Sequence, residues 1–164
     1  MIDIFSVLGH RLAAFGKTPD TVEVVRRAAV ENPWFLPQEI IRAVKAIRCE
    51  MLERQRLEAW AGAYPPVRTP KRVLVVMAGN IPLVGFFDLL CVLASGHACR
   101  VKPSSKDTVL IGYVVDLLRT IDPAIPLRMA EQGERLDAVI ATGSDNANRY
   151  FRMLFGGIPS LLRG

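Results

Sequence analysis

One apolar segment, residues 73–96, limits what the chain can fold into more than any other feature. It reads VLVVMAGNIPLVGFFDLLCVLASG and is long enough to raise the question of a membrane span. Asn80-Ile81-Pro82 interrupts it at mid-length, and Asp88 would place a carboxylate in the lipid of any such span. We therefore interpret the segment as a buried strand, a turn and a buried helix, and we do not expect an integral membrane protein.

The chain after residue 66 alternates between strand and helix patterns. Residues 73–77 are apolar without alternation, which is typical of a strand buried on both faces of a parallel sheet. A capping box is expected at Ser104-x-x-Asp107. The later patterns predict helix 83–95, strand 98–102, helix 107–120, strand 126–130, strand 136–142 and a helix from Ser144 to residue 155. This order of elements predicts an α/β fold with a doubly wound parallel sheet.

Residues 1–66 are predicted to be a helical N-terminal segment, or arm, and residues 67–164 a partial Rossmann-like nucleotide-binding unit. Thr18-Pro19 has the pattern of a helix start, and Asn32-Pro33 ends that helix. A second helix is expected over residues 38–61, where an apolar stripe follows helical spacing. The stripe consists of Ile40, Val44, Ile47 and Met51.

Composition narrows the classes of function. The formal net charge is +5 without a run of five like charges, so we expect no nucleic-acid partner, and an anionic small ligand suits the charge. His10 and His97 are the two histidines, and the cysteines have no metal-ligand spacing, so no metal site is predicted. Cys49, Cys91 and Cys99 are interpreted as reduced core residues of a cytoplasmic protein.

Polar segments follow three of the predicted strands. They are residues 78–82, 102–106 and 142–145, while the Gly-x-Gly-x-x-Gly fingerprint and the P-loop are both missing from the sequence. Ligands of open α/β sheets bind at the carboxyl ends of strands, so these segments are expected to form one site.

Each of these segments has a chemical and a structural interpretation. The Asn80 amide can donate to a developing oxyanion, or it can be part of a simple turn. Lys102 can reach ribose hydroxyls or a phosphate, or it can belong to a basic turn. The turn Thr142-Gly143-Ser144 can bind a pyrophosphate at a helix N-terminus, or Ser144 can be an ordinary helix cap.

The motifs NPWF (32–35), MAGNIP (77–82), SGH (95–97), SSKDT (104–108), ATGSDN (141–146) and RYF (149–151) occur in one order along the chain. With Asn80-x-Pro82, Lys102-Pro103-Ser104 and Thr142-Gly143-Ser144, this order resembles the aldehyde dehydrogenase superfamily. More closely, it resembles the acyl-CoA reductases, which include the fatty-acid reductase of bacterial bioluminescence. The resemblance covers the chain from about Asn32 to its end.

The resemblance implies a role for individual residues. It makes Asn80 the oxyanion residue and assigns Lys102 to the adenine ribose and the pair Gly143-Ser144 to the pyrophosphate. Ser105 stands where NAD-preferring relatives often have a glutamate, and Lys106 adds positive charge, so the resemblance implies NADPH rather than NADH. The cofactor-binding residues that it implies are Ala78, Gly79, Lys102, Ser104, Ser105, Thr142, Gly143 and Ser144.

The activity implied by the resemblance is reduction of an acyl-CoA to an aldehyde through a cysteine acyl-enzyme. None of the three cysteines stands at the place of the family's nucleophile, so the chain is expected to be a truncated, cofactor-binding portion that is inactive alone. Its expected partners are acyl-CoA and NADPH, together with a second copy or a missing C-terminal half. The alternatives are a non-catalytic nucleotide-binding or interaction module, and an aldehyde dehydrogenase that acts on free aldehydes.

Overall fold

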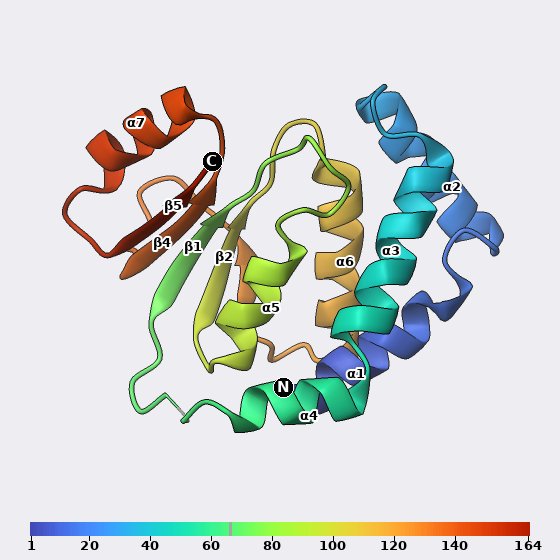
Figure 1. Ribbon diagram of the computed structural model, residues 1–164, viewed down its shortest axis with the longest axis horizontal. Helices are drawn as coiled ribbons and strands as arrows, with labels where there is room; N and C mark the ends of the chain where they lie inside the picture. The colour runs from blue at the N-terminus through green and yellow to red at the C-terminus, as the bar shows by residue number, and fades with distance from the viewer. Residues whose placement is uncertain (66) are drawn as a thin grey trace.

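The computed structural model describes residues 1–65 and 67–164, and Figure 1 shows their arrangement. Five parallel strands form one sheet in the order β3-β2-β1-β4-β5. The strands are β1 (Arg72–Val76), β2 (Ala98–Lys102), β3 (Leu127–Met129), β4 (Ala138–Thr142) and β5 (Ser160–Arg163). The predicted α/β fold with a helical N-terminal region and a parallel sheet is confirmed.

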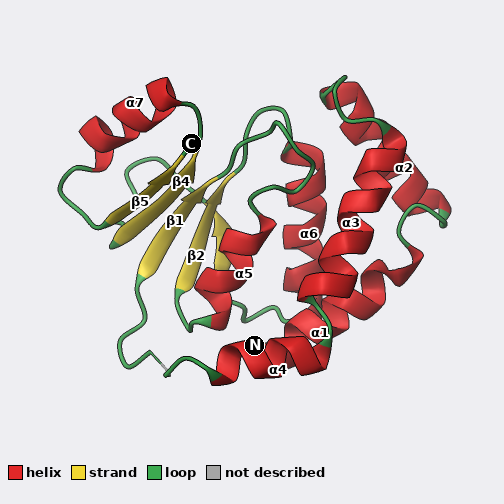
Figure 2. Ribbon diagram, in the orientation of Figure 1, coloured by secondary structure: helices red, strands yellow, loops and turns green. Residues whose placement is uncertain are grey.

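Helices cover both faces of this sheet, as Figure 2 shows. They are α1 (Ile2–Arg11), α2 (Pro19–Glu31), α3 (Pro37–Met51), α4 (Arg54–Gly62), α5 (Phe86–Ala94), α6 (Thr108–Ile121) and α7 (Asp145–Phe155), with a 3₁₀ turn η1 (Leu12–Ala14) after α1. Val73 and Val75 of β1 enter a large core that α5, α6 and the N-terminal helices share. Leu74 and Val76 enter a smaller core with Phe151 of α7 on the other face. Burial on both faces explains why β1 is apolar without alternation.

The apolar segment 73–96 forms the predicted strand, turn and helix. Gly96 adopts a φ of +85°, the left-handed conformation that commonly follows the end of a helix. Asp88 is buried in α5 and forms an ion pair with Arg163 of β5. In the described part of the chain, no helix combines the length and apolar character needed to cross a membrane.

The single helix predicted over residues 38–61 is wrong, because the chain forms α3 and α4 there with a break at Leu52. Leu52 is 2% exposed and packs against α1 at Gly9, where an added Cβ would lie 3.0 Å from the Leu52 Cβ. This close approach of Leu52 to α1 accompanies the change in helix direction. The sequence has neither Gly nor Pro at this break, so a prediction from helical spacing alone extends one helix across it.

The N-terminal helices share one core with the sheet and its helices. Phe5 of α1 meets Phe86 of α5 edge to face, with ring centroids 6.4 Å apart. Phe15 lies 5.6 Å from Tyr113 of α6, measured between ring centroids. Pro66, at the predicted boundary between the two segments, lies outside the described residues. Strand β5 was not predicted, because four residues after a proline carry little pattern.

Candidate functional site

The carboxyl ends of β1, β2 and β4 lie at one edge of the sheet. Val76, the last residue of β1, is paired with Lys102 of β2 on one side and with Ala141 of β4 on the other. The ladder continues one step beyond β1, since the Met77 N–H donates to the Lys102 carbonyl at 3.0 Å. The three polar segments predicted from the sequence therefore follow neighbouring strands, and parallel pairing brings them to the same edge.

The segment after β1 contacts the segment after β2 at Gly79. A Cβ on Gly79 would lie 2.5 Å from the Ser104 Oγ and 3.0 Å from the Lys106 Cβ. No side chain larger than hydrogen fits there without a shift of the neighbouring loop. The resemblance places Gly79 among the cofactor-binding residues, and the space beside it is occupied by Ser104 and Lys106.

Asn80 follows Gly79 and is exposed at this edge. Its side-chain amide has no hydrogen-bond partner among residues 1–65 and 67–164, so both N–H groups are available to a ligand. Ala78, just before Gly79, is partly buried. An exposed amide donor at the carboxyl end of a strand has the chemistry needed to stabilise an oxyanion.

Lys102 lines a cavity of about 630 Å³ between the sheet and α7, which we call the Lys102 cavity. Its other lining residues are Leu74, Ala130, Glu131, Gln132, Gly133, Glu134, Leu136, Tyr150, Leu154 and Phe155. Glu134 forms an ion pair with Arg100. The ammonium of Lys106 lies instead over the Trp34 ring, 5.2 Å from its centroid. Of the two lysines in this segment, Lys102 is the one that reaches the cavity.

The third segment caps α7. The Ser144 Oγ accepts from the Ala147 N–H at 3.4 Å, as the sequence predicted for a helix cap. The Gly143 N–H donates to the Arg163 carbonyl at 3.0 Å and is not free for a pyrophosphate. Asp145 places a carboxylate in the first turn of the helix. Any anion at this terminus would have to use the N–H groups that follow Gly143.

The capping box predicted at Ser104 and Asp107 does not form. The Asp107 carboxylate accepts from the Leu83 N–H at 2.8 Å, across to the loop after β1. The N-terminus of α6 is capped instead by Glu31, which accepts from the Thr108 N–H at 2.8 Å. Glu31, at the end of α2, therefore caps α6 in place of the local pair Ser104 and Asp107 that the sequence spacing predicted.

Two buried residues at this edge were missed as functional candidates. The Asn32 Nδ2 donates to the Gly79 carbonyl at 3.0 Å, and the Asn32 Oδ1 accepts from the Trp34 N–H at 3.1 Å. Burial raises the pKa of Asp107 to about 7, although the hydrogen bond from Leu83 lowers it. The motif NPWF at 32–35 begins with Asn32 and was the sequence feature that could have identified this residue, but the motif alone suggested no role for its side chain.

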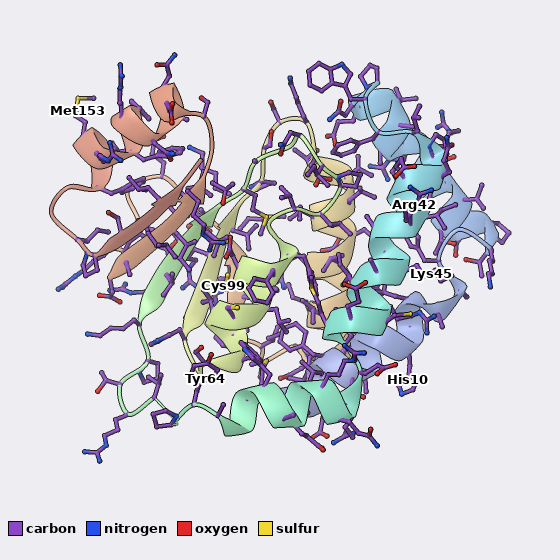
Figure 3. All side chains as sticks on the ribbon, viewed as in Figure 1. His10, Arg42, Lys45, Tyr64, Cys99 and Met153 are labelled. Carbon is purple, nitrogen blue, oxygen red and sulfur yellow. The ribbon has the colours of Figure 1, made fainter. Side chains whose placement is uncertain are left out.

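The three thiols lie away from the carboxyl edge. Burial raises the pKa of Cys91, in the middle of α5, to about 11. Burial also raises the pKa of Cys99 to about 12, and Figure 3 labels this residue on β2. Cys49 lies in α3. Thiols with such a raised pKa stay protonated at neutral pH and are poor nucleophiles. Within the described ranges, no group of three or more His, Cys, Asp or Glu side chains is placed to hold a metal ion.

Comparison with known proteins shows a likeness in fold to a solved structure. No protein-family model matches the sequence, and no curated protein matches it. Among solved structures, the chain is similar to a betaine aldehyde dehydrogenase of Staphylococcus aureus, a double mutant in complex with NAD⁺ and with a modified cysteine. The TM-score is 0.73 over 98% of this chain, at 12% sequence identity. The two chains share a fold. This chain spans 37% of the length of the dehydrogenase.

Proposed function

We propose that the chain binds NADPH at the carboxyl edge of its sheet and supplies Asn80 to an acyl-CoA reductase. The observation that carries the proposal is that pairing of β1, β2 and β4 brings three polar segments together at that edge. The shared fold with a dehydrogenase that was crystallised with NAD⁺ supports a nicotinamide cofactor. The choice of acyl-CoA as substrate rests on the motif resemblance.

The residues of the Lys102 cavity have the chemistry of a dinucleotide site. Leu136, Tyr150 and Leu154 offer apolar surface to an adenine ring, and the Lys102 ammonium offers charge to a ribose or phosphate. Glu131 also lines the cavity and would repel a 2′-phosphate placed next to it. The proposal therefore places the phosphate beside Lys102, and the resemblance adds Ser105, which stands where NAD-preferring relatives often have a glutamate.

The role proposed for Asn80 is to bind developing charge. When a thiolate attacks the thioester carbonyl, the carbonyl oxygen gains negative charge, and the exposed Asn80 amide is a donor that can bind it. Loss of one such donor typically costs about 100- to 1,000-fold in kcat. NADPH, when bound, supplies hydride to the acyl carbon. Because the three thiols lie elsewhere, the proposal places the nucleophile outside these 164 residues.

Calorimetric titration of the chain with NADPH and NADH tests the cofactor. We expect NADPH to bind about ten- to a hundredfold more tightly, the range of one charge-assisted contact to its 2′-phosphate. Ser105→Glu should abolish that preference, and Lys102→Met should weaken the binding of both cofactors. Lys45→Met is the matched control, since Lys45 is exposed on α3, far from the sheet in Figure 3. Equal affinity of the wild type for both cofactors would refute the assignment of Ser105.

One observation favours a second candidate, a nucleotide-binding module without catalysis. Cys91 and Cys99 both have a raised pKa and lie away from Asn80, so no thiol among residues 1–65 and 67–164 lies beside the oxyanion donor. Aldehyde formation from a long-chain acyl-CoA and NADPH by the isolated chain would exclude this candidate. A third assay, NADP⁺ reduction with a free aldehyde, separates a reductase from an aldehyde dehydrogenase.

A further inference from the structure

The loop that carries Asn80, residues 77–85, is held at two points, one on each side of that residue. Before Asn80, the Gly79 carbonyl accepts from the Asn32 side chain at 3.0 Å. After it, the Leu83 N–H donates to the Asp107 carboxylate at 2.8 Å. Both partners come from outside the loop, Asn32 from the end of α2 and Asp107 from the start of α6.

Both partner side chains are shielded from water. Asn32 is 3% exposed and Asp107 is 1% exposed. A buried hydrogen bond whose partner is removed leaves a polar group that water cannot reach, so its loss is more disruptive than that of a surface bond. Figure 1 shows the turn between α2 and α3 at the same end of the molecule as the loop after β1. These contacts thus connect the N-terminal helices to the carboxyl edge of the sheet.

The backbone at Leu83 needs such a contact. Leu83 has a φ of +58°, the left-handed region that a leucine rarely adopts. This conformation persists only where the surroundings hold it. The buried Leu83 side chain and the hydrogen bond from its N–H to Asp107 are what hold it here.

We propose that Asn32 and Asp107 are positioning residues that hold Asn80 toward the carboxyl edge of the sheet. The proposal rests on the proposed function, since that function gives Asn80 its role as oxyanion donor. Neither residue touches the ligand. Each acts on the backbone next to Asn80, one through a carbonyl and the other through an N–H group.

The contact at Leu83 responds to pH. The charged side chain that acts on Asp107 is that of Glu31, which caps α6 from the end of α2. Burial and the Glu31 carboxylate raise the pKa of Asp107 to about 7, so it ionises near neutrality. A carboxylate accepts a stronger hydrogen bond than a carboxylic acid does, and the Leu83 N–H should therefore report this ionisation.

The first experiment follows the Leu83 amide proton by NMR in the ¹⁵N-labelled chain between about pH 5.5 and 8.5. We expect its chemical shift to titrate with a midpoint near pH 7, the value given by burial of Asp107. Asp107→Asn should remove this titration. Asp137→Asn is the matched control, because Asp137 accepts from the Arg72 N–H at the same distance, 2.8 Å, at the other end of β1. A Leu83 shift that is flat in the wild type, or unchanged by Asp107→Asn, would overturn the assignment of Asp107.

The second experiment measures the backbone order parameter of Asn80. We expect a value near that of rigid backbone, about 0.85, falling below about 0.6 in Asn32→Ala. Asn32→Asp keeps the acceptor for Trp34 and loses the donor to Gly79, so it should show the same fall. An Asn80 amide as ordered in both variants as in the wild type would overturn the role of Asn32.

Titration of NADPH into the same variants separates this proposal from the proposed function. Because Gly79 lies at the proposed cofactor site, release of the loop in Asn32→Ala should lower the affinity for NADPH about two- to tenfold. A wild-type chain that binds no NADPH would refute the proposed function, while the two NMR measurements would still decide how the loop is held. Unchanged NADPH affinity in a variant whose loop is mobile would refute the positioning role.

Discussion

Gly79 is a residue whose missing side chain decides how closely two loops approach. Its α-hydrogen faces Ser104 and Lys106, and a Cβ added there would be 2.5 Å from the Ser104 Oγ. Gly79→Ala should therefore lower the free energy of unfolding by about 1–3 kcal/mol, the usual cost of overpacking. Urea denaturation measures the change.

The matched control for Gly79→Ala is Gly112→Ala. Gly112 lies inside α6, where a Cβ meets nothing within 4 Å, so alanine there should stabilise the chain by about 0.5–1 kcal/mol. Adding Ser104→Gly should recover part of the loss at Gly79. A Gly79→Ala chain as stable as the wild type would show that the loops move apart at little cost.

At the scale of elements, sequence patterns predicted the helices and strands that are determined by residues close together in the chain. β1, β2 and α6 follow from apolar runs and helical spacing. Asn80, Lys102 and Ser144 were chosen as candidates because each lies at or just after the end of a strand. The break between α3 and α4 and the contact sites of Asn32 and Asp107 depend on distant partners. Asn32 lies 47 residues from Gly79, and Asp107 lies 24 residues from Leu83. No periodicity along the chain encodes those contacts.

The ion pair between Asp88 of α5 and Arg163 of β5 should stabilise the attachment of the last strand. Arg163→Met would leave the buried Asp88 carboxylate without its cation, and we expect a loss of about 1–3 kcal/mol in the free energy of unfolding. Asp88→Asn in the same chain should restore part of the loss. Additive effects of the two substitutions in a double-mutant cycle would mean that the pair contributes nothing.

At the scale of the whole molecule, the helices cover the sheet unevenly. Next to α5, an apolar cavity of about 410 Å³ opens over β4 and β5, with Cys91, Ile140 and Leu161 among its lining residues. Leu161 is 51% exposed on β5, an edge strand of the sheet. Exposed apolar surface next to the open edge of a sheet favours association.

We expect the chain to self-associate through this surface, and Leu161→Lys should shift it toward the monomer in sedimentation experiments. Binding of a hydrophobic dye should fall in parallel. Glu39→Lys, an exposed change on α3, is a control for added charge. A wild-type chain that is monomeric at all concentrations and binds no dye would contradict this expectation.

The contacts that α2 makes also set an order of events as the chain is synthesised. Glu31 and Asn32 leave the ribosome early. Gly79, the partner of Asn32, follows 47 residues later, and Thr108, the partner of Glu31, follows 77 residues later. Contacts between such distant positions form late, because a long loop must close before they gain any energy. These contacts of the α2 end must therefore wait for the sheet, and we expect the loop that carries Asn80 to acquire its final shape late in folding.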